Sequence, residues 1–232
     1  MNKGVLQLKD FITDRLFPIL CLGCEKEGAW VCKKCEEKLK FLPPVWQSGT
    51  PPLSGMTAVF SYDQSVVSGA VRALKYEYAE LVIVWMGRAI DEWLDEGGAG
   101  MFPLECVIVP VPLHWRRKAK RGFNQAQLIA EELGRSLEMP VAQLLRRKHA
   151  TAPQTTKSRL ARLQNVDQAF SFTKPKFLFP ERRRAMRAEV EGRPLILVDD
   201  VTTTGATLAA CARVLQNHGF RDIYGFTFAK EL

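Results

Sequence analysis

The chain has 232 residues, of which 47% are apolar and 25% are charged, and its formal net charge is +8. These values are typical of a globular protein of one or two domains, and they exclude a disordered chain or a collagen-like repeat. No apolar run approaches the ~20 residues that span a bilayer, and Lys9, Asp10 and Asp14 interrupt the N-terminal segment. We therefore expect no membrane insertion, no signal peptide and a cytoplasmic location.

Apolar residues recur near helical spacing from Val5 to Phe17, which predicts an amphipathic helix packed on the rest of the protein. Residues 43–54 are rich in proline, glycine and serine, a composition typical of a linker. We place the domain boundary there. The expected organisation is a small N-terminal module over residues 1–50 and a larger domain over residues 55–232.

Four of the six cysteines form two C-x-x-C pairs, Cys21 with Cys24 and Cys32 with Cys35. Two such turns can direct four thiolates at one point, which completes a tetrahedral structural zinc site with no position left for a substrate. The alternatives are disulfide or redox chemistry, which a reducing compartment disfavours, and coincidence. The remaining cysteines, Cys106 and Cys211, lie in apolar contexts and are predicted to be core residues.

Strand-like and helix-like patterns alternate from Met56 onward. Strands are predicted over 57–62, 106–111, 144–145, 194–198 and 223–228, and helices over 65–76, 79–96, 124–137 and 206–217. This alternation predicts an α/β fold with a largely parallel sheet flanked by helices on both faces. Ligands of such sheets bind beyond the carboxyl ends of the strands, so candidate site residues are sought there.

The strand over 194–198 is followed directly by the run Asp199, Asp200, Val201, Thr202, Thr203, Thr204, Gly205, Ala206 and Thr207. Backbone N–H groups, threonine hydroxyls and the start of a helix together form a cradle for one phosphate group. The two carboxylates cannot bind that phosphate, so we expect them to bind sugar hydroxyls attached to it, with a hard cation nearby. The alternative is an acidic strand end capped by threonine.

The basic residues are clustered rather than spread along the chain. Arg116, Arg117, Lys118, Lys120 and Arg121 form one group, and two further groups lie at 146–148 and 182–184. Clustered cations indicate a polyanionic partner, either a phosphorylated small molecule or nucleic acid. A solvated basic surface is the alternative.

Several of these segments resemble a known family. The run from Leu197 to Thr207 is similar to the phosphoribosyl-pyrophosphate (PRPP) signature of type I phosphoribosyltransferases. Together with it, the segments 109–114, 121–126 and 74–76 and the paired cysteines resemble the ComF-type competence proteins, a group that includes the GntX-like proteins. The resemblance implies a type I phosphoribosyltransferase-like parallel sheet with flanking helices, joined to a small N-terminal four-cysteine zinc module.

The resemblance also implies roles for individual residues. The 5′-phosphate would sit on Thr203 to Thr207, and the ribose hydroxyls would contact Asp199 and Asp200, the candidate catalytic pair. The pyrophosphate would lie against residues 112–123, expected to be a loop, with Arg116, Arg117, Arg121 and Lys75 as candidate contacts. Magnesium would bridge sugar and pyrophosphate, and structural zinc would occupy the cysteine site.

The basic stretch over 146–165 resembles the mobile loop that covers the substrate in this superfamily. His114 and His149 are expected to be structural or surface residues rather than proton-transfer groups. The chain departs from the family pattern in residues 174–192, which are longer and more basic than usual, and at Tyr76-Glu77-Tyr78.

Two functions are consistent with these residues. One is Mg-dependent phosphoribosyl transfer from PRPP to an unknown acceptor. The other is a non-catalytic phosphate-binding or single-stranded-DNA-binding module in DNA uptake, with a DNA-uptake helicase as a possible partner implied by the resemblance. Base-stacking side chains would be needed for the second function, and Trp46, Trp115 and Phe123 are the candidates.

Overall fold

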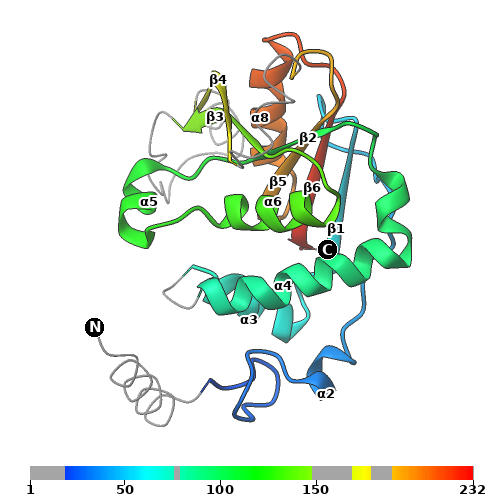
Figure 1. Cartoon of the computed structure of the whole chain (residues 1–232), viewed down its shortest axis with the longest axis vertical. Helices are drawn as coiled ribbons and strands as arrows, with labels where there is room; N and C mark the ends of the chain where they lie inside the picture. Colours follow the sequence, from blue (N-terminus) through cyan, green and yellow to red (C-terminus); the bar gives the residue numbers. More distant parts are fainter. Residues whose placement is uncertain (1–18, 76–78, 148–168, 179–189, 232) are drawn as a thin grey trace.

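The computed structural model describes residues 19–75, 79–147, 169–178 and 190–231. Its central sheet contains four parallel strands in the order β1 (Gly55–Ser61), β6 (Ile223–Lys230), β5 (Leu195–Thr202) and β2 (Val107–Pro110). Helices cover both faces of this sheet (Figure 1). The predicted α/β class and parallel sheet are therefore confirmed.

The longer helices agree closely with the predicted ranges: α3 (Ser65–Ala73), α4 (Ala79–Trp93), α6 (Gln125–Ser136) and α8 (Ala206–Gln216). After α4 the chain continues through a π-helical turn, Leu94–Gly98, and a short 3-10 turn, Ala99–Met101. Gly97 within this region has φ of 110°, a conformation that glycine adopts readily and other residues rarely do. Among the described residues, no helix is both long and apolar enough to cross a bilayer.

The core has two parts because strand side chains alternate between the faces of the sheet. Ile196 and Val198 of β5 belong to a cluster with residues of α3, α4 and α6. Leu195 and Leu197 belong to a second cluster with residues of α8. Burial on both faces explains why residues 195–198 read as an uninterrupted apolar run.

The strand expected at 144–145 exists, but it does not join the parallel sheet. β3 (Ala142–Arg147) pairs antiparallel with β4 (Phe170–Phe177) and forms a separate two-stranded sheet. β4 was not predicted, because its alternation of aromatic and polar residues includes a proline and two lysines. Its register with β3 shifts between Gln143 and Leu145, an irregularity that a period-two pattern does not reveal.

The segment 112–123, expected to be a loop, contains the short helix α5 (Trp115–Arg121). The expectation was wrong because the sequence WRRKAKR has no apolar period. Local groups define the helix instead. The His114 Nδ1 atom accepts a hydrogen bond from the Arg116 N–H at 3.2 Å, and Gly122, with φ of 81°, ends the helix. His114 is thus a buried capping residue, consistent with the structural role expected for it.

The N-terminal module packs directly on the larger domain, beneath α3 and α4 in Figure 1 and away from the β3–β4 hairpin. Its short helix α2 (Lys33–Glu36) carries Glu36, which accepts a hydrogen bond from the indole N–H of Trp85 in α4 at 2.8 Å. Cys21, Val31 and Cys35 belong to the same buried cluster as the residues of α3 and α4. The module therefore contributes to the main core.

The proline-rich segment after the module is also held against the domain. The Trp46 indole N–H donates to the Met101 carbonyl, and the Trp93 indole N–H donates to the Leu42 carbonyl, both at 2.9 Å. The exact boundary near residues 43–54 stays a prediction. The helix expected at 5–17, most of the stretch expected to form a lid (148–165) and His149 lie outside the described residues, as do residues 179–189.

Candidate functional site

The turn between β5 and α8 gathers the residues of the phosphate-binding prediction. β5 continues through both acids to Thr202, and α8 begins at Ala206. Within the turn, the Gly205 N–H donates to the Thr202 hydroxyl at 3.0 Å, and Gly205 has φ of 75°. The first N–H groups of α8 have no intrahelical acceptor, so they are available to an anion.

The two acids point to opposite faces of the sheet because they are consecutive residues of one strand. Asp200 lies on the α3 side, where its Oδ2 atom is 3.9 Å from the Lys75 Nζ atom just beyond the end of α3. Asp199 lies on the α8 side, beside the Leu195 and Leu197 row. Each acid also accepts a hydrogen bond from the next backbone N–H, at 2.9 Å for Asp199 and 2.8 Å for Asp200.

The surroundings of Asp199 disfavour its charge. Burial raises the pKa of Asp199 well above its usual value, and the adjacent Asp200 carboxylate raises it further. Arg147, at the end of β3, partly opposes this shift. Asp199 is therefore a carboxyl group that can hold a proton at a higher pH than an exposed aspartate can.

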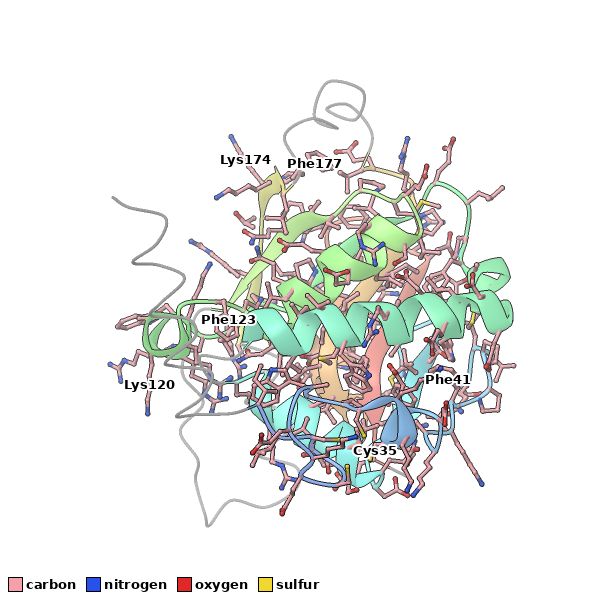
Figure 2. The ribbon with its side chains drawn as sticks, turned by 60° about the horizontal axis from the view of Figure 1, so that its bottom comes forward. Cys35, Phe41, Lys120, Phe123, Lys174 and Phe177 are labelled. Atoms are coloured by element: carbon pink, nitrogen blue, oxygen red, sulfur yellow. The ribbon has the colours of Figure 1, made fainter. Side chains whose placement is uncertain are left out.

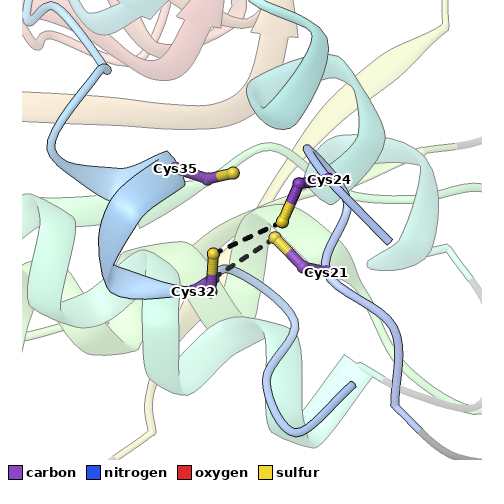
Figure 3. Close-up of side chains that lie close together, drawn as sticks. All are labelled: Cys21, Cys24, Cys32 and Cys35. Atoms are coloured by element: carbon purple, nitrogen blue, oxygen red, sulfur yellow. Dashed lines mark hydrogen bonds between the residues drawn. The ribbon is translucent and has the colours of Figure 1, made fainter. Parts of the chain in front are cut away.

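The four cysteines of the N-terminal module converge on one point, as Figure 3 shows. All four Sγ atoms lie within 4.8 Å of one another, and the Sγ atoms of Cys24 and Cys32 are 3.6 Å apart. A tetrahedral zinc with bonds of about 2.3 Å requires sulfur atoms about 3.8 Å apart. The predicted convergence of the four thiols is confirmed, and its dimensions suit a tetrahedral metal ion.

The thiols differ in how readily they lose a proton. Burial opposes ionisation of Cys21, but N–H groups of Cys32, Gly23 and Cys24 lower its pKa to about 6. The hydrogen bond with Cys24, together with burial, raises the pKa of Cys35 to about 12. The metal-free cluster thus favours one thiolate stabilised by backbone donors, and a bound cation would have to displace the remaining protons.

Comparison with known proteins gives the family of the chain. The phosphoribosyl transferase domain family matches residues 119–229. Competence protein F of Haemophilus influenzae is 29% identical over 222 residues, which is 91% of this chain and 90% of that protein. The DNA utilization protein YhgH of Salmonella typhi is 31% identical over 209 residues, 87% of this chain and 78% of that protein. This chain belongs to the ComF-type family of phosphoribosyltransferase-domain proteins.

The likeness to solved structures is more distant. A hypoxanthine phosphoribosyltransferase from Staphylococcus aureus is 11% identical with a TM-score of 0.32, over 61% of this chain and 59% of that chain. Family membership therefore depends on the sequence relatives and the domain match, together with the parallel sheet and the β5–α8 turn described above.

The basic residues assigned to pyrophosphate in this ComF-type chain occupy different positions. Lys75 lies beside Asp200, as described. On α5, the Arg116 guanidinium lies 5.2 Å from the centre of the Trp115 ring, while Arg117 is close enough to Arg147 to lower its pKa, although burial is the larger cause. Among the described residues, no ion pair or hydrogen bond joins Arg121 to either acid.

Two residues near the turn were not singled out as site residues by sequence reasoning. Arg147 was predicted to belong to a basic cluster and to the stretch that resembles the substrate-covering loop, yet β3 brings it into electrostatic range of Asp199. Thr50 lies in the segment read as a linker, and its hydroxyl donates to the Thr204 carbonyl at 3.0 Å. The basic run at 146–148 was the one available signal for Arg147, and no sequence pattern marks Thr50.

Two of the three aromatic residues considered for base stacking are half-buried against the core instead. Trp46 packs against Phe102 and Tyr224, and Phe123 packs against the larger core cluster. Trp115, with 61% of its surface exposed, remains the candidate that is open to a partner.

Proposed function

We propose that this ComF-type protein binds PRPP with magnesium and transfers its phosphoribosyl group to an acceptor. The observation that carries the proposal is the turn between β5 and α8, where an acid pair, three threonines and a glycine with positive φ lead into a helix N-terminus. A 5′-phosphate on Thr203 to Thr207 would accept hydrogen bonds from backbone N–H groups and would be attracted to the positive N-terminal end of α8. The ribose hydroxyls would then reach Asp199 and Asp200.

The charges around the turn support a ligand with a second anionic group. Lys75 sits on the Asp200 face, and Arg147 lies within electrostatic range of both Asp199 and Arg117. The repulsion between Arg147 and Arg117 would be relieved by a bound anion. These cations can stabilise the pyrophosphate as it departs with the electrons of the bond to the ribose C1 atom.

The acid pair has suitable oxygens for a hard cation. Asp199 and Asp200 each use one oxygen to accept a backbone N–H, and carboxylate oxygens are preferred ligands of magnesium. A bound magnesium ion would supply charge neutralisation at the ribose and pyrophosphate oxygens. The chain itself would hold the 5′-phosphate, orient the ribose and keep a proton on or near Asp199.

Calorimetric titration with PRPP and magnesium tests this proposal. We expect saturable binding by the wild-type chain. The affinity of the double variant Asp199→Ala, Asp200→Ala should be at least tenfold weaker. The matched control replaces another adjacent acid pair, Asp95→Ala with Glu96→Ala, which is exposed and remote from the turn. Release of pyrophosphate from PRPP would identify turnover. Failure of the wild type to bind PRPP would contradict the proposal.

A second candidate function is binding of single-stranded DNA, favoured by the surface of α5. This helix presents an exposed tryptophan and five cations in seven residues, and Lys120 points away from the rest of the chain in Figure 2. An exposed indole can stack on a base while the cations contact phosphates. The relatives named for competence and DNA utilization support a role in DNA handling. For such a role we propose a cytoplasmic location and a DNA-uptake helicase as partner.

Fluorescence titration with an oligonucleotide would test this second candidate. Binding should weaken steeply as salt rises, and Trp115→Ala should reduce affinity by about tenfold or more if a base stacks on the indole. Binding by the acid-pair variant at wild-type strength, without PRPP turnover by the wild type, would favour a binding module over an enzyme.

We also propose that the cysteine cluster holds structural zinc. Four convergent sulfurs with the spacing of a tetrahedral site leave no open coordination position, so a catalytic role for this metal is not expected. Elemental analysis of freshly purified protein should find about one zinc per chain, the stoichiometry that four ligands require. Less than half an equivalent would contradict the assignment.

A further inference from the structure

The peptide unit between Thr204 and Gly205 is fixed at both of its polar atoms. Its N–H, on Gly205, donates to the Thr202 hydroxyl at 3.0 Å. Its carbonyl oxygen, on Thr204, accepts from the Thr50 hydroxyl at 3.0 Å. One of these two side chains belongs to the turn itself, whereas the other comes from a segment that precedes the first strand of the domain.

The orientation of this peptide decides the charge that the turn presents to a ligand. A backbone N–H attracts a phosphate oxygen, and a carbonyl oxygen repels it. If the peptide rotated, the Thr204 carbonyl could turn toward the space into which the N–H groups at the start of α8 point, where the phosphate would bind. Gly205 alone cannot prevent that rotation, because glycine occupies regions of both positive and negative φ with similar ease.

The segment that carries Thr50 is held on both sides of it. Before Thr50, Gln47 exchanges two backbone hydrogen bonds with Met56 at 2.9 Å each, and its side chain accepts from Lys230 of β6 at 2.6 Å. After Thr50, the side chain of Leu53 is buried in the core with Leu208 of α8, and the Ser54 N–H donates to the Ile223 carbonyl at 2.8 Å. Thr50 is therefore a fixed donor although its side chain is exposed.

A further contact joins the same segment to α8. The Arg213 side chain donates to the Pro51 carbonyl at 3.3 Å. The segment thus touches the turn at Thr204 and, near its C-terminal end, the helix that follows the turn.

We infer that Thr50 is a positioning residue for the proposed phosphate site: its hydroxyl holds the Thr204 carbonyl away from the anion, in concert with the Thr202 hydroxyl. The inference rests on the proposed function, because the anion is the 5′-phosphate of PRPP. It makes the segment between the cysteine module and β1 part of the ligand site rather than a passive connection.

The test is calorimetric titration of three variants with PRPP and magnesium. Thr50→Val removes the donor and keeps the shape, and Thr50→Ser keeps the donor. Thr173→Val, in β4, makes the same chemical change at a threonine whose side chain has no hydrogen bond in the described part of the chain. The net effect of one hydrogen bond predicts a two- to tenfold weaker affinity, roughly, for Thr50→Val. Thr50→Ser and Thr173→Val should bind like the wild type.

A second readout separates positioning from general stability. Amide hydrogen exchange at Gly205 should accelerate by a similar factor in Thr50→Val, while the melting temperature stays within about 2 °C of that of Thr173→Val, since the lost bond is exposed. Wild-type affinity in Thr50→Val, or an equal loss in Thr50→Ser, would overturn the positioning role alone. Absence of PRPP binding by the wild type would overturn the proposed function and this role with it.

Discussion

The four-cysteine module and the β5–α8 turn both bring like groups together, but they do so in opposite ways. The cysteine cluster is partly closed: Cys21 and Cys35 are buried and neighbouring residues pack against α3, while Cys24 is exposed. Glycine is required there because a Cβ atom at Gly23 would lie 2.8 Å from the Val66 side chain and 2.9 Å from the Cys35 sulfur. The turn is open, with Thr203 and Thr204 exposed.

The difference separates a site built for stability from one built for a ligand. Four thiolates held this close together need a cation to neutralise them, and the bound cation would cross-link the module. The turn instead keeps a feature that disfavours the ligand-free chain, namely a carboxyl group whose pKa is raised by burial. Loss of metal should therefore reduce stability more than any change in the turn, and changes in the turn should affect binding more than stability.

Replacement of the exposed cysteine is the most direct test of whether the cysteine module stabilises the chain through a metal. Cys24 is exposed, so Cys24→Ser removes little packing, and without a metal it should change stability by less than about 0.5 kcal/mol. If a metal is bound, the loss of a ligand should cost about 3 kcal/mol or more, which lowers the melting temperature by roughly 6–12 °C in a chain of this size. Thermal unfolding followed by circular dichroism would measure it.

A chelator provides the control for this result. Metal removal should lower the melting temperature of the wild type by a similar amount and should change Cys24→Ser little further. A wild type that is insensitive to the chelator would contradict a structural metal.

Gly205 tests the second half of the comparison. Gly205→Ala forces a residue with a side chain into φ of 75° and places its Cβ atom 3.1 Å from the Met56 sulfur. We expect a loss of about 1–2 kcal/mol in stability and at least a tenfold loss in PRPP affinity, because the turn must shift. Denaturant unfolding and calorimetry would measure the two effects.

Gly219→Ala is the matched control for that variant. Gly219 has φ of 93°, and a Cβ atom there meets nothing within 4 Å. Its substitution should cost a similar free energy for the backbone conformation while leaving PRPP affinity unchanged. Equal affinities in the two variants would show that the turn does not bind the ligand.

The comparison also explains which features could be predicted from sequence. The strand over 195–198 and its acid pair were predictable, because burial on both faces produces an apolar run and the acids end it. The cysteine convergence was predictable because the C-x-x-C spacing constrains where the sulfurs point. Both signals are local in the sequence.

Features that depend on distant contacts were not predictable. α5 depends on the His114 cap rather than on periodicity. β3 leaves the parallel sheet because β4, some 25 residues further along, supplies its partner, as in the pairing of Arg146 with Ser171. The contact between Thr50 and Thr204 joins positions 154 residues apart, and a proline-rich segment gives no hint of a hydrogen-bond donor aimed at the turn.

The smallest effect should come from the charge on Asp199. Its pKa is raised from the usual value of 3.8 by burial and by Asp200, so the folded chain binds a proton more tightly than the unfolded chain. Stability from this group is fully present below about pH 4 and is lost as the pH rises toward the folded-state pKa. An asparagine at this position carries no charge at any pH, so the Asp199→Asn variant should not lose this stability as the pH rises. In the absence of ligand, its free energy of unfolding should exceed that of the wild type by about 1 kcal/mol at pH 7 and should equal it near pH 4. The exposed Asp222→Asn should show no such gain at either pH. Chemical denaturation at both pH values would measure the difference.

A gain in stability accompanied by weaker PRPP binding would mean that Asp199 serves the ligand at a cost to the stability of the fold. A neutral-pH stability equal to or below that of the wild type would instead mean that the surroundings of Asp199 stabilise its charge, and the contrast between a stabilising module and a ligand-adapted turn would not hold at this residue.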